Sequence, residues 1–92
     1  MVEDRVEIVN LLGLHARAAA RFVRTATRYR ASVTVSKDGT TTDGKSILGI
    51  LFLAAAVGSQ IVIAVDGDDE DDALKALVAL VADGLDEKDD QP

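Results

Sequence analysis

The sequence contains no cysteine, no tryptophan and only one proline in 92 residues. Without cysteine, the chain can form no disulfide, no thiolate metal site and no thiol nucleophile. Its longest apolar run, residues 47–58, is too short for a membrane-spanning helix of about 20 residues. Residues 1–7 are charged throughout and do not match a signal peptide. We therefore expect a cytoplasmic protein with no membrane insertion.

Patterns of metal-binding residues are also missing. The acidic stretch at residues 66–72 does not have the spacing of an EF-hand calcium loop. We interpret it as negative charge placed before a helix start, where the helix dipole favours it. We expect neither a metal site nor a bound cofactor.

The charge is distributed unevenly along the chain. The formal net charge of −6 at pH 7 argues against a general nucleic-acid-binding protein. Negative charge gathers late, in residues 66–72 and 83–90, while positive charge gathers early. The early basic residues are Arg17, Arg21, Arg24, Arg28 and Arg30. We expect one basic surface, facing solvent or an acidic partner, on an otherwise acidic molecule.

Hydrophobic periodicity predicts four strands and three helices. Alternating or β-branched residues indicate strands at 5–9, 32–36, 40–42 and 61–65. Apolar residues at helical spacing indicate helices at 16–28, at 47 to about 55, and after residue 72. The core stripe of the first helix comprises Ala19, Phe22, Val23 and Ala26, and that of the last comprises Leu74, Leu77, Val78, Val81 and Leu85. We expect a single domain over residues 1–92, with a flexible tail at 86–92.

The element order βαββαβα predicts an α+β fold, in which three helices cover one face of a four-stranded antiparallel sheet. The first helix crosses over between the first two strands, so these strands run parallel and leave room for another strand between them. The apolar strand at 61–65 suits this central position. We therefore predict the strand order 1-4-2-3.

The only histidine, His15, lies in residues 13–17, Gly-Leu-His-Ala-Arg, just before the first predicted helix. A helix start presents unpaired backbone N–H groups and the positive end of the helix dipole, which suit an anion. A neutral imidazole there can attack phosphorus, and the amides and Arg17 can hold the resulting phosphate. A lone histidine in a loop is more often an ordinary surface side chain. The helix start, the guanidinium, the small residues Gly13 and Ala16 and the basic stripe together favour a phosphoryl acceptor.

A second motif points to a different chemistry. Residues 39–46 match the P-loop pattern G-x-x-x-x-G-K-[ST], which would make Lys45 and Ser46 nucleotide ligands. The apolar strand at 61–65, which ends before an aspartate, imitates the magnesium-binding strand of such proteins. However, residues 40–42 are β-branched and favour a strand, and one βαβ unit is too few for a nucleotide-binding sheet. We therefore interpret Ser46 as the N-cap of the second helix.

The second predicted helix is too apolar for all its side chains to face the sheet. Its large apolar residues are Ile47, Leu48, Ile50, Leu51 and Phe52. Either the core is crowded here, or part of the helix forms a hydrophobic contact patch rimmed by arginines, as in transient interfaces. The sequence leaves both interpretations open. In the second one, the partner-binding residues are Ala20, Arg24, Ile47, Leu48 and Leu51.

Two motifs resemble those of the HPr family of histidine-containing phosphocarrier proteins. Residues 13–17 resemble its phosphorylation-site signature, and residues 43–49, Asp-Gly-Lys-Ser-Ile-Leu-Gly, resemble its regulatory-serine signature. The likeness covers nearly the whole chain and implies the family's open-faced β-sandwich. The sequence departs at Leu12 and Ala18, where many members have a hydroxyl residue and a proline. It is also similar to the nitrogen-branch relatives, called NPr.

The resemblance implies a stoichiometric phosphocarrier of the phosphoenolpyruvate-dependent phosphotransferase system, not an enzyme. His15 would accept a phosphoryl group from enzyme I and pass it to a IIA-type protein, in sugar uptake or a nitrogen-regulatory branch. Arg17 would stabilise the phosphate. Ser46 would be phosphorylated by a serine kinase/phosphorylase, which weakens the exchange. We expect a monomer; the alternative is an HPr-like regulatory binding module that is controlled through Ser46 without phosphotransfer.

Overall fold

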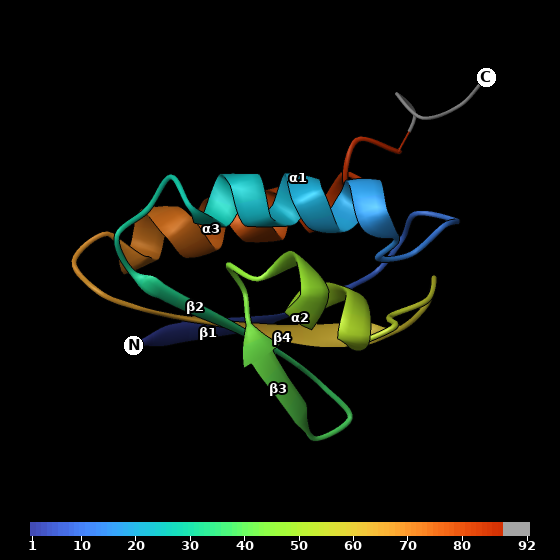
Figure 1. The fold of residues 1–92 in the computed structure, drawn as a ribbon. Helices are drawn as coiled ribbons and strands as arrows, with labels where there is room; N and C mark the ends of the chain where they lie inside the picture. Colours follow the sequence, from blue (N-terminus) through green and yellow to red (C-terminus); the bar gives the residue numbers. More distant parts are fainter. Residues whose placement is uncertain (88–92) are drawn as a thin grey trace.

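The computed structural model describes residues 1–87, and its elements follow the predicted order (Figure 1). The strands are β1 (Val2–Glu7), β2 (Ser32–Lys37), β3 (Thr40–Asp43) and β4 (Gln60–Asp66). The helices are α1 (Ala16–Ala26), α2 (Ile47–Phe52) and α3 (Glu70–Ala82). Residues 88–92 of the predicted tail lie outside the described residues.

The four strands form one sheet in the order β1-β4-β2-β3, with each neighbouring pair antiparallel. This confirms the predicted order 1-4-2-3. β4 lies between β1 and β2, so Val65 pairs with Val2 on one side and with Val33 on the other. Ile61, Ile63 and Val65 are fully buried, which explains why this strand is so apolar.

All three helices lie on one face of the sheet. α1 and α3 lie side by side across it, and α2 lies in front of the sheet, next to β3, in the view of Figure 1. α3 packs against β1 and β4, while α2 packs against α1 and β3. The residues buried on α1 are Ala18, Ala19, Phe22 and Ala26, and those on α3 are Ala73, Leu77 and Val81. The predicted α+β fold with helices on one face is confirmed.

Several elements end at residues other than the predicted ones, for local reasons. β1 begins at Val2 instead of residue 5, because its charged residues 3–5 still pair with β4. α2 ends at Phe52, because Ala54 adopts a left-handed φ of 50°. α3 begins at Glu70, so three acidic side chains lie within its first turn, where the helix dipole favours them.

Within residues 1–87, no helix is both long and apolar enough to cross a membrane. The same part of the chain holds no group of three or more histidine, aspartate or glutamate side chains arranged for a metal ion.

Candidate functional site

His15 forms the N-cap of α1. Its backbone is extended, with φ −75° and ψ 179°, and its carbonyl accepts a helical hydrogen bond from the Ala19 N–H at 2.8 Å. Its side chain completes the cap, because Nδ1 accepts a hydrogen bond from the Arg17 backbone N–H at 3.3 Å. The structure thus places the histidine at the helix start, as the sequence predicts.

The two nitrogens of the half-buried imidazole lie in different surroundings. Nε2 is shielded from solvent, whereas Nδ1 faces the first turn of α1. In a neutral imidazole, the nitrogen that accepts a hydrogen bond carries the available lone pair. Nδ1 therefore carries the available lone pair, and the helix start lies where an anion attached to that atom would be stabilised.

A tight loop leads from β1 to His15. The Gly13 N–H donates to the Asn10 carbonyl at 3.2 Å, and the Asn10 side chain Nδ2 donates to the Gly13 carbonyl at 2.8 Å. The Leu14 N–H donates to the Ala55 carbonyl at 2.9 Å. Gly13 has a φ of 64°, and a Cβ there would lie 2.5 Å from the Ala55 oxygen. Only glycine combines this φ with such a close backbone approach.

A glutamate from the far end of the chain holds the tip of this loop. The carboxylate of Glu87 accepts the Leu11 N–H at 2.8 Å and the Leu12 N–H at 2.6 Å. Sequence patterns single out neither Asn10 nor Glu87 as a site residue. The turn signal in the Asn-Leu-Leu-Gly run at 10–13 could have indicated Asn10. Nothing local indicates Glu87, because it lies 76 positions from Leu11.

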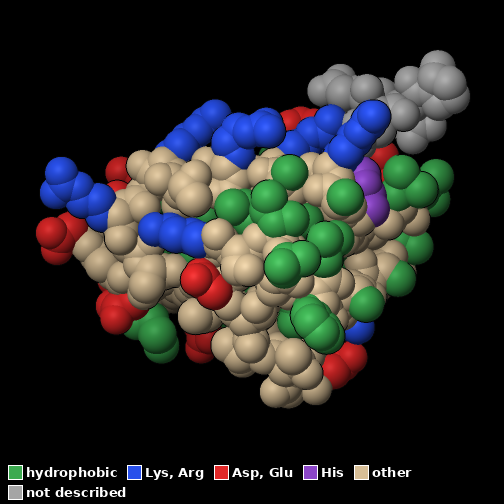
Figure 2. All heavy atoms as spheres, viewed as in Figure 1, with side chains coloured by type: hydrophobic (Ala, Val, Ile, Leu, Met, Phe, Trp, Pro, Cys, Tyr) green, Lys and Arg blue, Asp and Glu red, His purple; other side chains and the backbone are tan. Residues whose placement is uncertain are grey.

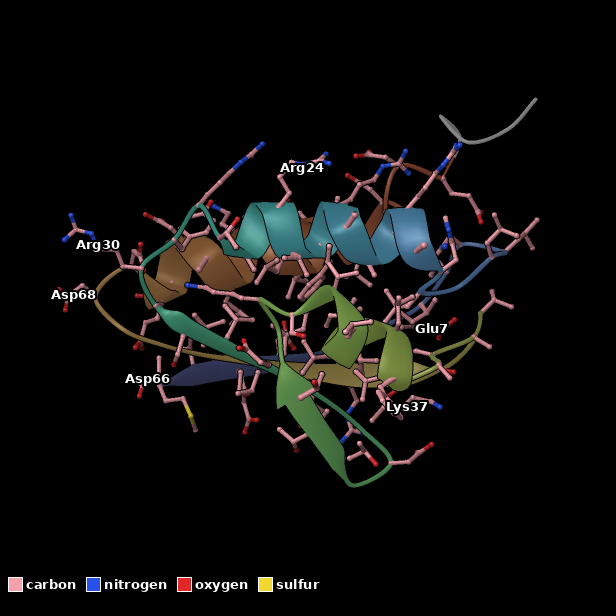
Figure 3. All side chains as sticks on the ribbon, viewed as in Figure 1. Glu7, Arg24, Arg30, Lys37, Asp66 and Asp68 are labelled. Atoms are coloured by element: carbon pink, nitrogen blue, oxygen red, sulfur yellow. The ribbon has the colours of Figure 1, made fainter. Side chains whose placement is uncertain are left out.

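α1 carries a row of basic side chains on its exposed side (Figure 2). Arg17 and Arg24 are exposed, and Arg24 points away from the sheet (Figure 3). Arg21 is half-buried, and its Nη1 donates to the backbone carbonyls of Leu85 and Asp86, both at 3.1 Å. The predicted basic surface is present, but Arg21 also bonds α1 to the segment that follows α3.

Exposure on α2 decides between the two interpretations of its apolar sequence. Ile50 and Leu53 are buried, whereas Leu48 is 75% exposed and Phe52 is 88% exposed. Figure 2 shows apolar side chains gathered between the row of basic side chains and the sheet, and beside the single histidine. An exposed apolar patch bordered by arginines is therefore present. Of the predicted partner-binding residues, Arg24, Ile47 and Leu48 are exposed, and Ala20 and Leu51 are half-buried.

Ser46 caps α2, because its Oγ accepts a hydrogen bond from the Gly49 N–H at 3.0 Å. The preceding strand β3 pairs with β2 along its length, so this backbone is extended and does not wrap around a phosphate. The Lys45 Nζ donates to the Tyr29 carbonyl at 2.8 Å, which bonds the residue before the α2 cap to the turn that follows α1. These contacts argue against the P-loop interpretation and account for Lys45 structurally.

Known proteins share both the sequence and the fold of this chain. The family model described as PTS HPr component phosphorylation site matches residues 2–83. The phosphocarrier protein HPr of Neisseria meningitidis serogroup A is 44% identical over 81 residues, covering 88% of this chain and 91% of that protein. The HPr-like protein Crh of Halalkalibacterium halodurans is 42% identical over 81 residues, covering 88% and 96%. The crystal structure of HPr-C-His from Thermoanaerobacter tengcongensis has a TM-score of 0.89 at 42% identity, covering 92% of this chain and 96% of that one.

The family match extends over every strand and helix and includes both the His15 loop and the Ser46 cap. The identities lie well above the level at which only the fold would be shared. The chain belongs to the HPr family, and it is a phosphocarrier of the phosphotransferase system, a non-catalytic intermediate in phosphoryl transfer.

Proposed function

We propose that His15 carries the phosphoryl group of this phosphocarrier and that Nδ1 is the reacting atom. The N-cap geometry supports this, because Nδ1 faces the first turn of α1 while Nε2 is buried. A phosphoryl group carried by another protein cannot reach a nitrogen that is buried. The burial of Nε2 therefore favours Nδ1.

The transfer exchanges one phosphorus–nitrogen bond for another. The bond in the donor's phosphohistidine breaks as the lone pair of Nδ1 forms a new bond to phosphorus, and the same exchange then runs toward the next acceptor. The transition state is loose, so positioning and charge stabilisation supply most of the rate. The backbone N–H of Arg17, which donates to Nδ1 here, then donates to a phosphoryl oxygen, and the exposed Arg17 guanidinium adds positive charge.

Enzyme I is the proposed donor and a IIA-type protein the proposed acceptor. The apolar patch on α2 and the arginines of α1 form one surface beside His15, which suits partners that bind weakly and exchange fast. The proposed partner-binding residues are Ala20, Arg24, Ile47, Leu48 and Leu51. We place the exchange in the cytoplasm. We also expect a monomer, in which the single surface beside His15 binds enzyme I and the IIA-type protein in turn.

Ser46 is the proposed regulatory site. Its Oγ lies at the start of α2, next in sequence to the exposed Ile47 and Leu48. A phosphate there adds about −1.5 to −2 charges at neutral pH. This charge would repel acidic partners at the apolar patch and weaken the phosphoryl exchange. A serine kinase/phosphorylase would set this state.

A second proposed role, beside phosphoryl transfer, is that of a regulatory binding module controlled through Ser46. The likeness to Crh supports this role, because the solution structure of Crh that is 42% identical to this chain is described as the Bacillus subtilis catabolite repression HPr. Within the carrier function, both a sugar-branch and a nitrogen-branch IIA protein are candidate acceptors.

Incubation with phosphoenolpyruvate and enzyme I tests these proposals together. We expect one phosphoryl group per chain, labile in acid and stable in base as a phosphohistidine is, and absent from His15→Ala. Ser46→Ala serves as the matched control and should be labelled like the wild type. Label that persists in His15→Ala would refute the assignment to His15, and an unlabelled wild-type protein would refute the proposed transfer from enzyme I.

A further inference from the structure

The tip of the loop before His15 is held by one side chain from far along the chain. Within residues 9–13, Asn10 and Gly13 bond to each other. Among the described residues, the only hydrogen bonds of this segment to distant parts of the chain are those from the Leu11 and Leu12 N–H groups to Glu87. The side chains of Leu11 and Leu12 are 78% and 58% exposed, so hydrophobic packing does not fix the tip. The Glu87 carboxylate is therefore its anchor.

The geometry of this anchor requires a carboxylate. Oε2 of Glu87 accepts from Leu11, and Oε1 accepts from Leu12. Two successive backbone N–H groups that point the same way form an anion-binding concavity, and hydrogen bonds to a charged acceptor are stronger than neutral ones. A glutamine at this position offers only one acceptor, and its NH₂ group would face an N–H donor.

The turn after α3 presents Glu87 to the loop. Leu85 and Asp86 both adopt left-handed backbone conformations, with φ of 55° and 57°, which are costly for residues other than glycine. The surroundings hold them there, because the Leu85 side chain is fully buried and Arg21 donates to both of their carbonyls. The Glu87 N–H closes the turn by donating to the Gly84 carbonyl at 3.0 Å.

We propose that Glu87 is a positioning residue for phosphoryl transfer. By holding the loop tip, it keeps His15 in the N-cap geometry with Nδ1 facing the first turn of α1; this rests on the proposed function of His15. A loop that is held only at its ends lets the ring sample other orientations. Transfer depends on alignment of the attacking atom, where a misplacement of about 1 Å can cost about 100-fold in rate. Glu87 therefore acts on the rate within the complex and not on partner binding.

The full chain carrying Glu87→Gln tests this against the wild type and Asp83→Asn. The control removes the same charge at the end of α3, from a side chain that makes no hydrogen bond to the described residues. Steady-state phosphorylation by enzyme I and phosphoenolpyruvate gives kcat and KM for each carrier. We expect E87Q to lower kcat about ten-fold at unchanged KM, since positioning governs the rate of the bound complex. We expect D83N to leave both unchanged, and the amide proton resonances of Leu11 and Leu12 to move upfield only in E87Q.

The outcomes separate this proposal from the proposed function. An undiminished kcat in E87Q, an equal loss in both variants, or a raised KM at unchanged kcat overturns the positioning role. Amide resonances that do not move overturn the contact itself. A wild-type carrier that takes no phosphoryl group overturns the proposed function and the positioning role together, and the amide resonances then still report on the contact.

Discussion

The ring of His15 performs the task that a serine, threonine or aspartate side chain performs at the start of most helices. It accepts a hydrogen bond from a backbone N–H of the first turn through Nδ1, the atom we propose as the nucleophile. Phosphorylation of Nδ1 must therefore replace this cap bond with bonds to phosphoryl oxygens. Helix capping and phosphate binding then use the same N–H group of Arg17. This geometry needs no proline at Ala18, which is fully buried in a helix that begins two residues earlier.

Gly13 allows a test of the loop at one position. An alanine there would have to keep a φ of 64°, and its Cβ would lie 2.5 Å from the Ala55 oxygen and 3.0 Å from the Ala56 Cα. The left-handed conformation costs about 1 kcal/mol, and moving the opposed backbone adds about 1–3 kcal/mol. We expect Gly13→Ala to lower the free energy of unfolding in urea by about 2–4 kcal/mol.

Gly39→Ala is the matched control. Gly39 also has a left-handed φ, of 86°, but a Cβ there would meet no atom within 4 Å. Only the conformational cost remains, so we expect a loss of about 1 kcal/mol. Equal losses in the two variants would show that the close approach of Gly13 to Ala55 contributes nothing to stability.

α2 illustrates what a helical pattern leaves open. The cap residue Ser46 and the apolar run predict the helix, but they do not say which side faces the protein, because every side is apolar. The packing of Gly49 decides this, since a Cβ there would collide with the Thr42 side chain. Gly49 must therefore face β3, and Leu48 and Phe52 are left exposed. Thr42 contacts the helix only in the folded chain, so sequence spacing could not supply this orientation.

The Ser46 cap is worth a measurable share of stability. Ser46→Ala removes the acceptor for the Gly49 N–H, and loss of such a cap costs about 1 kcal/mol. We expect the urea midpoint to fall accordingly while the denaturant slope stays unchanged, because the buried surface is the same.

Ser59→Ala is the control for this change. It deletes the same hydroxyl from a half-buried serine whose side chain makes no hydrogen bond to the described residues. We expect its stability to stay within about 0.5 kcal/mol of the wild type. If Ser46→Ala were equally mild, the Oγ contact would not contribute as an N-cap.

The fold as a whole was more accessible to prediction than the contacts around its site. The crossover through α1 and the apolar strand β4 are enough to predict the strand order. The crossover makes β1 and β2 parallel with room for a strand between them, and the apolar β4 suits that central position. The placement of His15 follows from equally local signals. The bond from Glu87 to the loop tip does not, because it depends on a left-handed turn after α3 that hydrophobic periodicity cannot reveal. Contacts of this kind depend on the complete fold.

Asp69 joins the segment before β2 to the start of α3 through hydrogen bonds of its carboxylate, and the pKa of this carboxyl group makes these bonds depend on pH. Its carboxylate accepts the N–H groups of Arg30 and Ala31, both at 2.9 Å, so the segment before β2 is joined to the start of α3. The Arg30 donor, followed by that of Ala31, holds the pKa of Asp69 below its ordinary value. Since the folded pKa is the lower one, this stabilisation is present above the unfolded pKa of about 3.9 and is lost as the pH falls through the folded value. We expect Asp69→Asn to unfold at lower urea concentration at pH 7, and the difference from the wild type to shrink below about pH 4.

Asp68→Asn shows why charge alone cannot produce this result. Asp68 is the neighbouring residue, exposed and pointing into solvent (Figure 3). In a chain of net charge −6, removing one acid from the crowded stretch at 66–72 relieves repulsion, so the charge effect of either variant is to stabilise. Asp68→Asn should therefore be as stable as the wild type or slightly more so at pH 7. A lower stability of Asp69→Asn runs against the charge effect and must come from the lost hydrogen bonds. If the stability difference between Asp69→Asn and the wild type stayed constant down to a pH at which Asp69 is protonated, the effect would come from the shape of the side chain and not from its charge.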